Sequence, residues 1–328
     1  MGNISTAGNL SLYSFTEGAA DEGMPNLTSG DENVAIGDEA LKANTSGSNN
    51  TAIGDEALKS NTSGSDNTAI GKNSLYTNTS GSKNVAIGVE ALKFNRTGTN
   101  NVAIGFEALQ RNTTGQKNVA IGAQSGYSNT TGVQNTSVGH EALEANTTGY
   151  RNTALGDSSL KLNSNGFENT GIGVYSLDAN TTGDRNTAVG VNTLSTNTTG
   201  SNSTAIGVNA LYANTSGYEN TAVGKDALLS NSSGYQNIQF FTAGANERMR
   251  IQHDGNVGIG TAAPGSKLQV TGGDISFGTR MDSATRYIGK GNSAGGGFGG
   301  NSNWIAFASD AADDWITFGV HESGVGGG

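Results

Sequence analysis

The sequence predicts a mainly β fold, a parallel β-solenoid or β-roll built from a repeat of 17 residues. The repeat occupies residues 33–236 and runs for twelve copies without an insertion or deletion. An asparagine opens every copy except one, where Ser203 stands, and a glycine follows four residues later. A second asparagine and a second glycine recur at positions 12 and 15 of every copy. Such a short, fixed period means that each unit stacks on its neighbour.

The limits of the repeat divide the chain into four segments. Residues 1–32 precede it and are interpreted as an N-terminal attachment segment, with a strand-like stretch at 10–15. Residues 33–236 are the solenoid shaft. Residues 237–272 carry β-hairpin signals, a strand-like stretch at 248–251 and the turn pair Asp254-Gly255, and are expected to form a connector. Residues 273–328 are glycine-rich, contain both tryptophans and are expected to form a small β module at the distal tip.

Within one repeat, positions 2–4 predict a short strand, because Thr or Val, then nearly always Ala, then Ile, Val or Leu stand between asparagine and glycine. Positions 12–15 have the chemistry of a turn. Positions 6–11 remain open between a second strand and one helical turn. The pairs Glu39–Lys42 and Glu56–Lys59 favour the helical turn, because residues three apart face each other on a helix and point to opposite faces of a strand.

Each coil has a thin core, so a single chain is expected to be only marginally stable. Each coil has about two large apolar side chains, such as Ile53 and Leu58. The free energy gained by burying them must offset the conformational entropy lost when 17 residues become ordered. Oligomerisation would bury more surface. The alanine column at position 3, which begins at Ala35 and Ala52, is a candidate contact with another chain; alternatively, alanine simply fits a narrow coil. The sixth copy has Gly126 where the others have leucine, and the neighbouring Tyr127 is a candidate to fill that space.

Composition argues against several functions. The formal net charge is −10 and no basic run occurs, so nucleic acid is not expected as a partner. No apolar run approaches the ~20 residues of a membrane span, so membrane insertion is not expected. The N-terminal residues show no signal peptide, which predicts assembly in the cytoplasm.

No catalytic, cofactor or metal site is predicted. Gly291-Asn-Ser-Ala-Gly295 matches G-x-S-x-G, but the glycines that follow cannot begin the helix that a nucleophile elbow needs. The three histidines are far apart in the sequence, and His140 occupies an outward, variable position. Carboxylates at position 7, such as Glu39 and Glu56, form a column that lysine at position 10 is expected to neutralise.

Tandem Asn-Thr/Val-Ala-Ile-Gly resembles the head repeat of trimeric autotransporter adhesins, a left-handed parallel β-roll assembled as a trimer. The longer form, Asn-Thr-Ala-Ile-Gly-x-x-Ala-Leu-x-x-Asn-Thr-Thr-Gly, resembles repeats of bacteriophage tail fibres. The connector segments 247–251, 256–261 and 264–270 are similar to a region near the distal end of phage fibres. These segments together cover most of the chain. The adhesin repeat is a few residues shorter, so its geometry need not carry over to positions 6–11.

The resemblance implies a homotrimeric tail fibre, of a phage or of a related tail-like injection machine, that belongs to the virion. The absence of a recognisable anchor barrel and signal peptide favours this over the alternative, a bacterial cell-surface trimeric adhesin. A tail-spike enzyme that degrades glycans is the third possibility, but it would need a cleft with paired carboxylates on irregular coils.

The N-terminal segment is expected to dock on a tail or baseplate protein, and the tip module to bind a host-surface glycan or protein. Aromatic rings with amide neighbours suit sugars. The alternative is that the tryptophans form the core of the module. The candidate receptor-binding residues are Tyr287, Phe298, Asn301, Asn303, Trp304 and Trp315.

Overall fold

The computed structural model describes residues 10–12, 26, 28–241, 247–271, 275–276, 287–289, 304–308 and 315–319. The chain divides into two units, residues 1–246 and 247–328, and each is described by itself. The twelve repeats are numbered as coils 1–12, beginning with Asn33, and the residues of each coil are numbered as positions 1–17.

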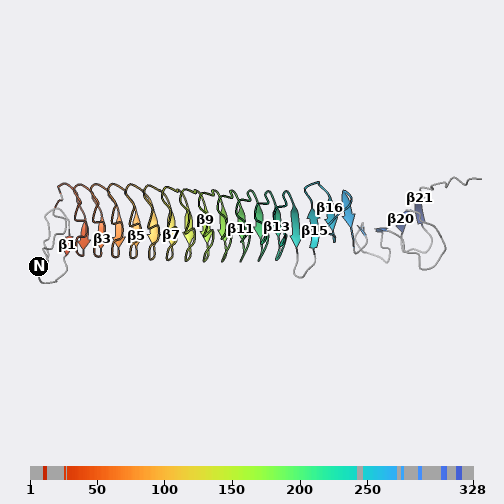
Figure 1. Cartoon of the computed structure of the whole chain (residues 1–328), viewed down its shortest axis with the longest axis horizontal. Coiled ribbons are helices and arrows are strands. Elements are labelled where there is room, and N and C mark those ends of the chain that lie inside the picture. Colours follow the sequence, from red (N-terminus) through yellow and green to blue (C-terminus); the bar gives the residue numbers. More distant parts are fainter. Residues whose placement is uncertain are drawn as a thin grey trace, which may run out of the picture. The chain divides into compact units, whose positions relative to one another are not determined.

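The first unit is a parallel β-solenoid with one three-residue strand per coil, which confirms the predicted fold class (Figure 1). Each strand pairs with the strand one repeat away, so that Ala35 lies opposite Ala52. The coil strands are β2 (Val34–Ile36), β3 (Thr51–Ile53), β4 (Thr68–Ile70), β5 (Val85–Ile87), β6 (Val102–Ile104), β7 (Val119–Ile121), β8 (Thr136–Val138), β9 (Thr153–Leu155), β10 (Thr170–Ile172), β11 (Thr187–Val189), β12 (Thr204–Ile206) and β13 (Thr221–Val223).

A further strand extends the ladder at each end of the twelve coils. β1 (Leu10–Leu12) pairs in parallel with β2, within the stretch predicted to be strand-like. β14 (Ile238–Phe241) pairs in parallel with β13 in the same 17-residue register. The parallel sheet therefore continues past residue 236, where the sequence repeat ends.

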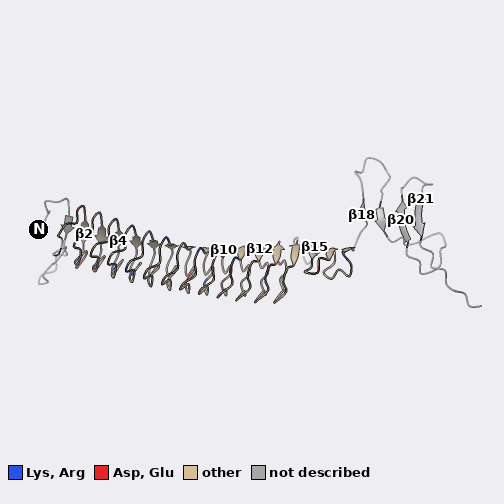
Figure 2. Cartoon of the chain, turned by 90° about the horizontal axis from the view of Figure 1, so that it is seen from above, with Lys and Arg blue, Asp and Glu red and all other residues tan. Residues whose placement is uncertain are grey.

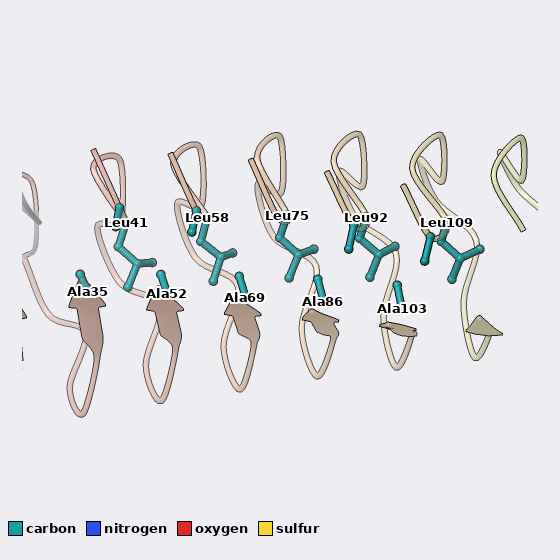
Figure 3. Packing of buried hydrophobic residues seen from close by; sticks show 14 of the residues in the cluster. Ala35, Leu41, Ala52, Leu58, Ala69, Leu75, Ala86, Leu92, Ala103 and Leu109 are labelled. Carbon is teal, nitrogen blue, oxygen red and sulfur yellow. The ribbon is translucent and has the colours of Figure 1, made fainter. Parts of the chain in front are cut away.

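The strands place position 3 inside the coil and positions 2 and 4 outside. Ala52 is fully buried, whereas its neighbours Thr51 and Ile53 are half-buried on the outer surface. The expectation that the alanine column contacts another chain is therefore wrong, as is the assignment of Ile53 to the core. The leucine at position 9, such as Leu58, enters the coil from the opposite wall and leaves room only for a methyl group on the strand (Figure 3).

Positions 6–11 form neither a helix nor a strand but a series of overlapping turns. In coil 1, Ala40 N donates to Gly37 O at 3.4 Å, Lys42 N to Glu39 O at 3.3 Å and Asn44 N to Leu41 O at 3.1 Å. The φ angles of Glu39 and Leu41 are 52° and 53°, the positive value that a type II turn requires at its third residue. Both expectations for this segment were wrong.

The turns also leave alternate peptide groups free to bond to the adjacent coil. Leu41 N, for example, donates to Ala57 O of coil 2 at 3.0 Å. Residues i and i+3 of a β-turn approach each other as they do in a helix. The Glu39–Lys42 pairing therefore forms at 2.5 Å without any helical turn.

Two buried asparagine ladders run along the solenoid. At position 12, Asn61 Nδ2 donates to Asn44 Oδ1 at 3.0 Å and to Gly64 O at 2.9 Å. At position 1, Asn50 Nδ2 donates to Asn33 Oδ1 at 3.1 Å and to the same Gly64 O at 2.9 Å. Each glycine carbonyl at position 15 thus joins both ladders, except that of Gly217, whose coil has Ser203 at position 1 and which accepts only from Asn214.

The apolar half of the interior is interrupted once, between coils 6 and 7. One hydrophobic cluster contains Ala120 and Leu109, and the next begins at Ala142. Between them, Ser125 Oγ donates to Ser137 Oγ at 2.7 Å beside Gly126. Tyr127 does not take the place of the missing leucine. It is half-buried at position 10, with its ring centroid 5.1 Å from the Arg111 guanidinium.

The second unit contains the predicted hairpin and a small antiparallel sheet. β15 (Glu247–Ile251) pairs antiparallel with β16 (Val257–Ile259), and β16 pairs in parallel with β17 (Leu268–Val270). The hairpin turn includes Gly255 at a φ of 78°. The sheet contains β18 (Ile275–Ser276), β19 (Tyr287–Gly289), β20 (Trp304–Ala308) and β21 (Trp315–Gly319), in that order.

Candidate functional site

The outer face of the strand ladder is the most uniform surface of the solenoid. Positions 2 and 4 of β2–β13 carry only Thr, Val, Ile and Leu, and none of them is charged. Their exposure reaches 46% at Leu155 and 44% at Ile206. Figure 2 shows Lys, Arg, Asp and Glu in the segments that connect the strands. Position 4 is an unbroken column of Ile, Val and Leu, and an exposed apolar column of this kind is typical of a surface that another molecule covers.

Positions 7 and 10 form a charged column on the turn side. Lys59 Nζ lies 2.6 Å from Glu56 Oε1 and also contacts Glu39 of the preceding coil. Hydrogen bonds from Lys42 and then Lys59 lower the pKa of Glu39, and Glu39 and Glu56 raise the pKa of Lys59.

The predicted lysine pairing of the position 7 carboxylates is confirmed in four coils. Besides Glu39 and Glu56, Glu90 lies 2.8 Å from Lys93, and Glu141 lies 2.6 Å from Lys161. In coil 5, Glu107 has a different partner, because its Oε2 accepts from Gln124 Nε2 at 2.8 Å.

Positions 16 and 17 form a second outer column, in which side chains of successive coils stack. The rings of Tyr150 and Phe167 are parallel, with centroids 4.9 Å apart. Beside them, Glu168 accepts from Arg151 at 3.0 Å and from Arg185 at 3.2 Å. These hydrogen bonds, that of Arg151 first, lower the pKa of Glu168. The column links neighbouring coils and offers an exposed surface of mixed charge.

The predicted receptor-binding residues fall partly within the described sheet of the second unit. Tyr287 and Trp315 are both register partners of Ala308, and Trp304 is the register partner of Gly319. Ala308 and the residues opposite it therefore form one row across three strands. The side chains at all these positions lie outside what the structure describes, as do Phe298, Asn301 and Asn303 entirely.

The described residues provide no evident catalytic or metal chemistry. No group of three or more His, Cys, Asp or Glu side chains among them is placed to hold a metal ion. His140 is 53% exposed, and its Nδ1 lies 3.4 Å from Asp157 Oδ2. Gly291–Gly295 lies outside the described residues. None of the described segments forms a helix with the length and hydropathy needed to cross a membrane.

Comparisons of the chain with protein families, curated proteins and solved structures found no match. The sequence analysis did not identify the strand face as an outer surface. A signal was present, because positions 2 and 4 vary only among β-branched residues and leucine, whereas the outward position 6 varies freely.

Proposed function

We propose that this chain is a structural and adhesive fibre that works as a homotrimer. In this proposal the solenoid is a shaft, the N-terminal segment attaches it to a phage tail or baseplate, and the tip module binds a glycan or protein on the host surface. The fibre of a related tail-like injection machine would have the same construction. The proposal includes no catalysis.

The uncharged strand face carries this proposal. Its side chains repeat with the coils from Val34 to Val223, so a second copy in the same register would meet matching residues along the whole ladder. Burying exposed Ile, Val and Leu side chains contributes roughly 25 cal/mol per Å² of apolar surface. A long interface of this kind would supply the stabilisation that the thin interior of one chain lacks.

Light scattering on the purified full chain tests the assembly. We expect a mass three times the 33.2 kDa of one chain. The double variant Ile104→Lys/Ile121→Lys places charge on the strand face of two adjacent coils and is expected to dissociate the trimer. The matched control is Thr114→Lys/Thr131→Lys, at exposed position 14 of the same coils. A folded wild-type monomer, or a trimer indifferent to the face variant, would contradict the proposal.

Host adsorption tests the adhesive role. Deleting residues 273–328 is expected to leave the solenoid folded and to abolish binding to host cells. Normal adsorption of the truncated chain would place receptor binding on the shaft or on another protein.

The alternative is a bacterial cell-surface trimeric adhesin, which the same interface would also serve. Labelling the chain with gold in electron micrographs separates the two. Label on the tail of a particle supports the fibre, and label on the cell envelope supports the adhesin.

A further inference from the structure

A notch of about 620 Å³ interrupts the outer surface of coils 7–9. Its lining includes one unusually short side chain at position 7. Position 7 carries Glu, Gln, Asn, Asp or Tyr in every other coil but serine in coil 8. Ser158 is only 4% exposed, and its Oγ donates to Asp157 Oδ1 at 2.9 Å. Glu141 and Tyr175 line the notch from the adjacent coils, which lie roughly 10 Å apart at ~4.8 Å per coil.

The polar groups that line the notch are mostly held in place by one another. Lys161 Nζ lies 2.6 Å from Glu141 Oε2 and 3.5 Å from Glu144 Oε2. His140 Nδ1 faces Asp157 Oδ2 at 3.4 Å. Asp178 differs, because its Oδ1 is enclosed and has no hydrogen-bond partner. An enclosed acceptor without a donor is unfavourable, but a ligand in the notch cannot reach an enclosed atom. Asp157, whose side chain is 47% exposed, is the accessible carboxylate.

The charge of the notch selects among ligands. Three carboxylates, those of Glu141, Asp157 and Asp178, line it with one ammonium group, that of Lys161. Phosphate, sulfate and acidic sugars would be repelled. The Lys161 ammonium lies between the carboxylates of Glu141 and Glu144, and the described residues hold no group of three or more His, Cys, Asp or Glu placed to bind a metal ion.

Apolar surface is also available in the notch. Tyr175 is 46% exposed and Leu162 is 49% exposed, and both line it. An exposed ring beside hydrogen-bond acceptors matches a pyranose, which has an apolar C–H face and a rim of hydroxyl donors.

We propose that this notch binds a neutral hexopyranose unit of a glycan, with the sugar ring on Tyr175 and its hydroxyls donating to Asp157. The inference goes beyond the proposed fibre, because it places a sugar site on the shaft. It requires neither the trimer nor the tip module, so its failure would leave the assembly proposal intact.

Saturation-transfer NMR on the full chain tests the site, with methyl glycosides of glucose, galactose, mannose and N-acetylglucosamine as probes. We expect at least one to bind in the millimolar range or more tightly. Binding of none of the four would overturn the proposal.

Filling the notch provides the decisive variant. Ser158→Glu introduces the residue that position 7 carries in five coils, and Lys161 can pair with it as Lys59 pairs with Glu56. We expect this variant to fold and to lose binding. The matched control is Asn192→Glu, at position 7 of coil 10 and outside the notch. Undiminished binding by Ser158→Glu would refute the site.

Removing the ring provides a second, graded test. Tyr175→Ala is expected to weaken binding roughly three- to tenfold, the value of one aromatic contact. Tyr212→Ala, at an exposed tyrosine of coil 11, serves as the control. Equal affinity of the two variants for the sugar would show that Tyr175 does not contact it.

Discussion

At the scale of single residues, the buried asparagines show how a polar interior is kept stable. Asn112 is fully buried and uses both ends of its amide. Its Nδ2 donates to Asn95 Oδ1 at 2.7 Å and to Gly115 O at 3.1 Å, while its Oδ1 accepts from Asn129 at 2.8 Å. Because every polar atom of the side chain has a partner, its burial costs little, whereas removing one member leaves its neighbours unsatisfied.

We therefore expect Asn112→Ala to destabilise the solenoid by about 3 kcal/mol, since it orphans a donor on Asn129 and an acceptor on Asn95. Urea unfolding followed by circular dichroism measures the change. Thr114→Ala, at an exposed position of the same coil, is the control and is expected to change stability by less than about 0.5 kcal/mol. Equal effects would mean that the ladder contributes no net stability.

Asp178 predicts a pH dependence. Burial raises its pKa, against a smaller lowering by a hydrogen bond from Ser195. A carboxyl group whose folded pKa exceeds its unfolded pKa adds stability at low pH, and that contribution is lost as the pH rises through the folded pKa.

Asp178→Asn should therefore raise the melting temperature at pH 7, where the buried charge is unfavourable. The gain should vanish below about pH 3.9, the ordinary value for aspartate. Thermal melts of wild type and variant at both pH values measure it. Asp66→Asn is the control, at an exposed position where other coils carry asparagine. A gain that does not depend on pH would rule out desolvation of the carboxylate as the cause.

At the scale of elements, the sequence was sufficient to predict the strands but not the turns. The period, the strand at positions 2–4 and the stacking all followed from the repeat. The conformation of the segment from Gly37 to Asn44 could not be predicted, because glutamate and lysine three residues apart meet in a β-turn as well as in a helix. Nothing in the sequence signals that leucine at position 9 adopts a positive φ, a conformation unusual for any residue but glycine.

The inward or outward direction of the strand residues could not be predicted from the strand alone. An alternating strand indicates that Ala52 and Ile53 face opposite sides, but not which side is interior. The leucine on the opposite wall decides it, because it fills the coil. The notch in coils 7–9 likewise depended on which side chains neighbour Ser158 in space, although the serine itself is visible in the sequence as an exception at position 7.

The break in the apolar core gives a prediction at this scale. Gly126 has a φ of 61°, close to that of the leucines in other coils, so leucine can adopt this backbone. An added Cβ would lie 3.0 Å from Leu109 Cδ2, the mobile end of a side chain. Ser125→Ala/Gly126→Leu/Ser137→Ala restores the common repeat and joins the two clusters. We expect a gain of about 2 kcal/mol from the buried leucine.

Chemical unfolding of this triple variant should be compared with that of Ser125→Ala/Ser137→Ala, which removes the serine hydrogen bond without filling the space. The comparison isolates the leucine. If the triple variant is no more stable than the double variant, the gap around Gly126 has already closed by relaxation of Leu109.

At the scale of the whole solenoid, adjacent coils are linked at every level, by contacts that recur every 17 residues. Backbone bonds such as Gly54 N to Ile36 O, the asparagine ladders and the ion pairs all join neighbouring coils. A chain of this kind is quasi-one-dimensional, because each unit interacts with its neighbours and little else. Its length should therefore be adjustable in whole coils and in no other increment.

Deleting residues 67–117 removes three complete coils and joins position 17 at Asp66 to position 1 at Asn118. We expect a folded solenoid shortened by roughly 14 Å, at ~4.8 Å per coil. Deleting 67–116 instead removes one residue fewer and shifts every later asparagine and leucine out of its column at the junction. That variant should lose cooperative unfolding. Small-angle scattering and thermal melts compare the two, and equal stability of both deletions would show that the 17-residue register is not what holds neighbouring coils together.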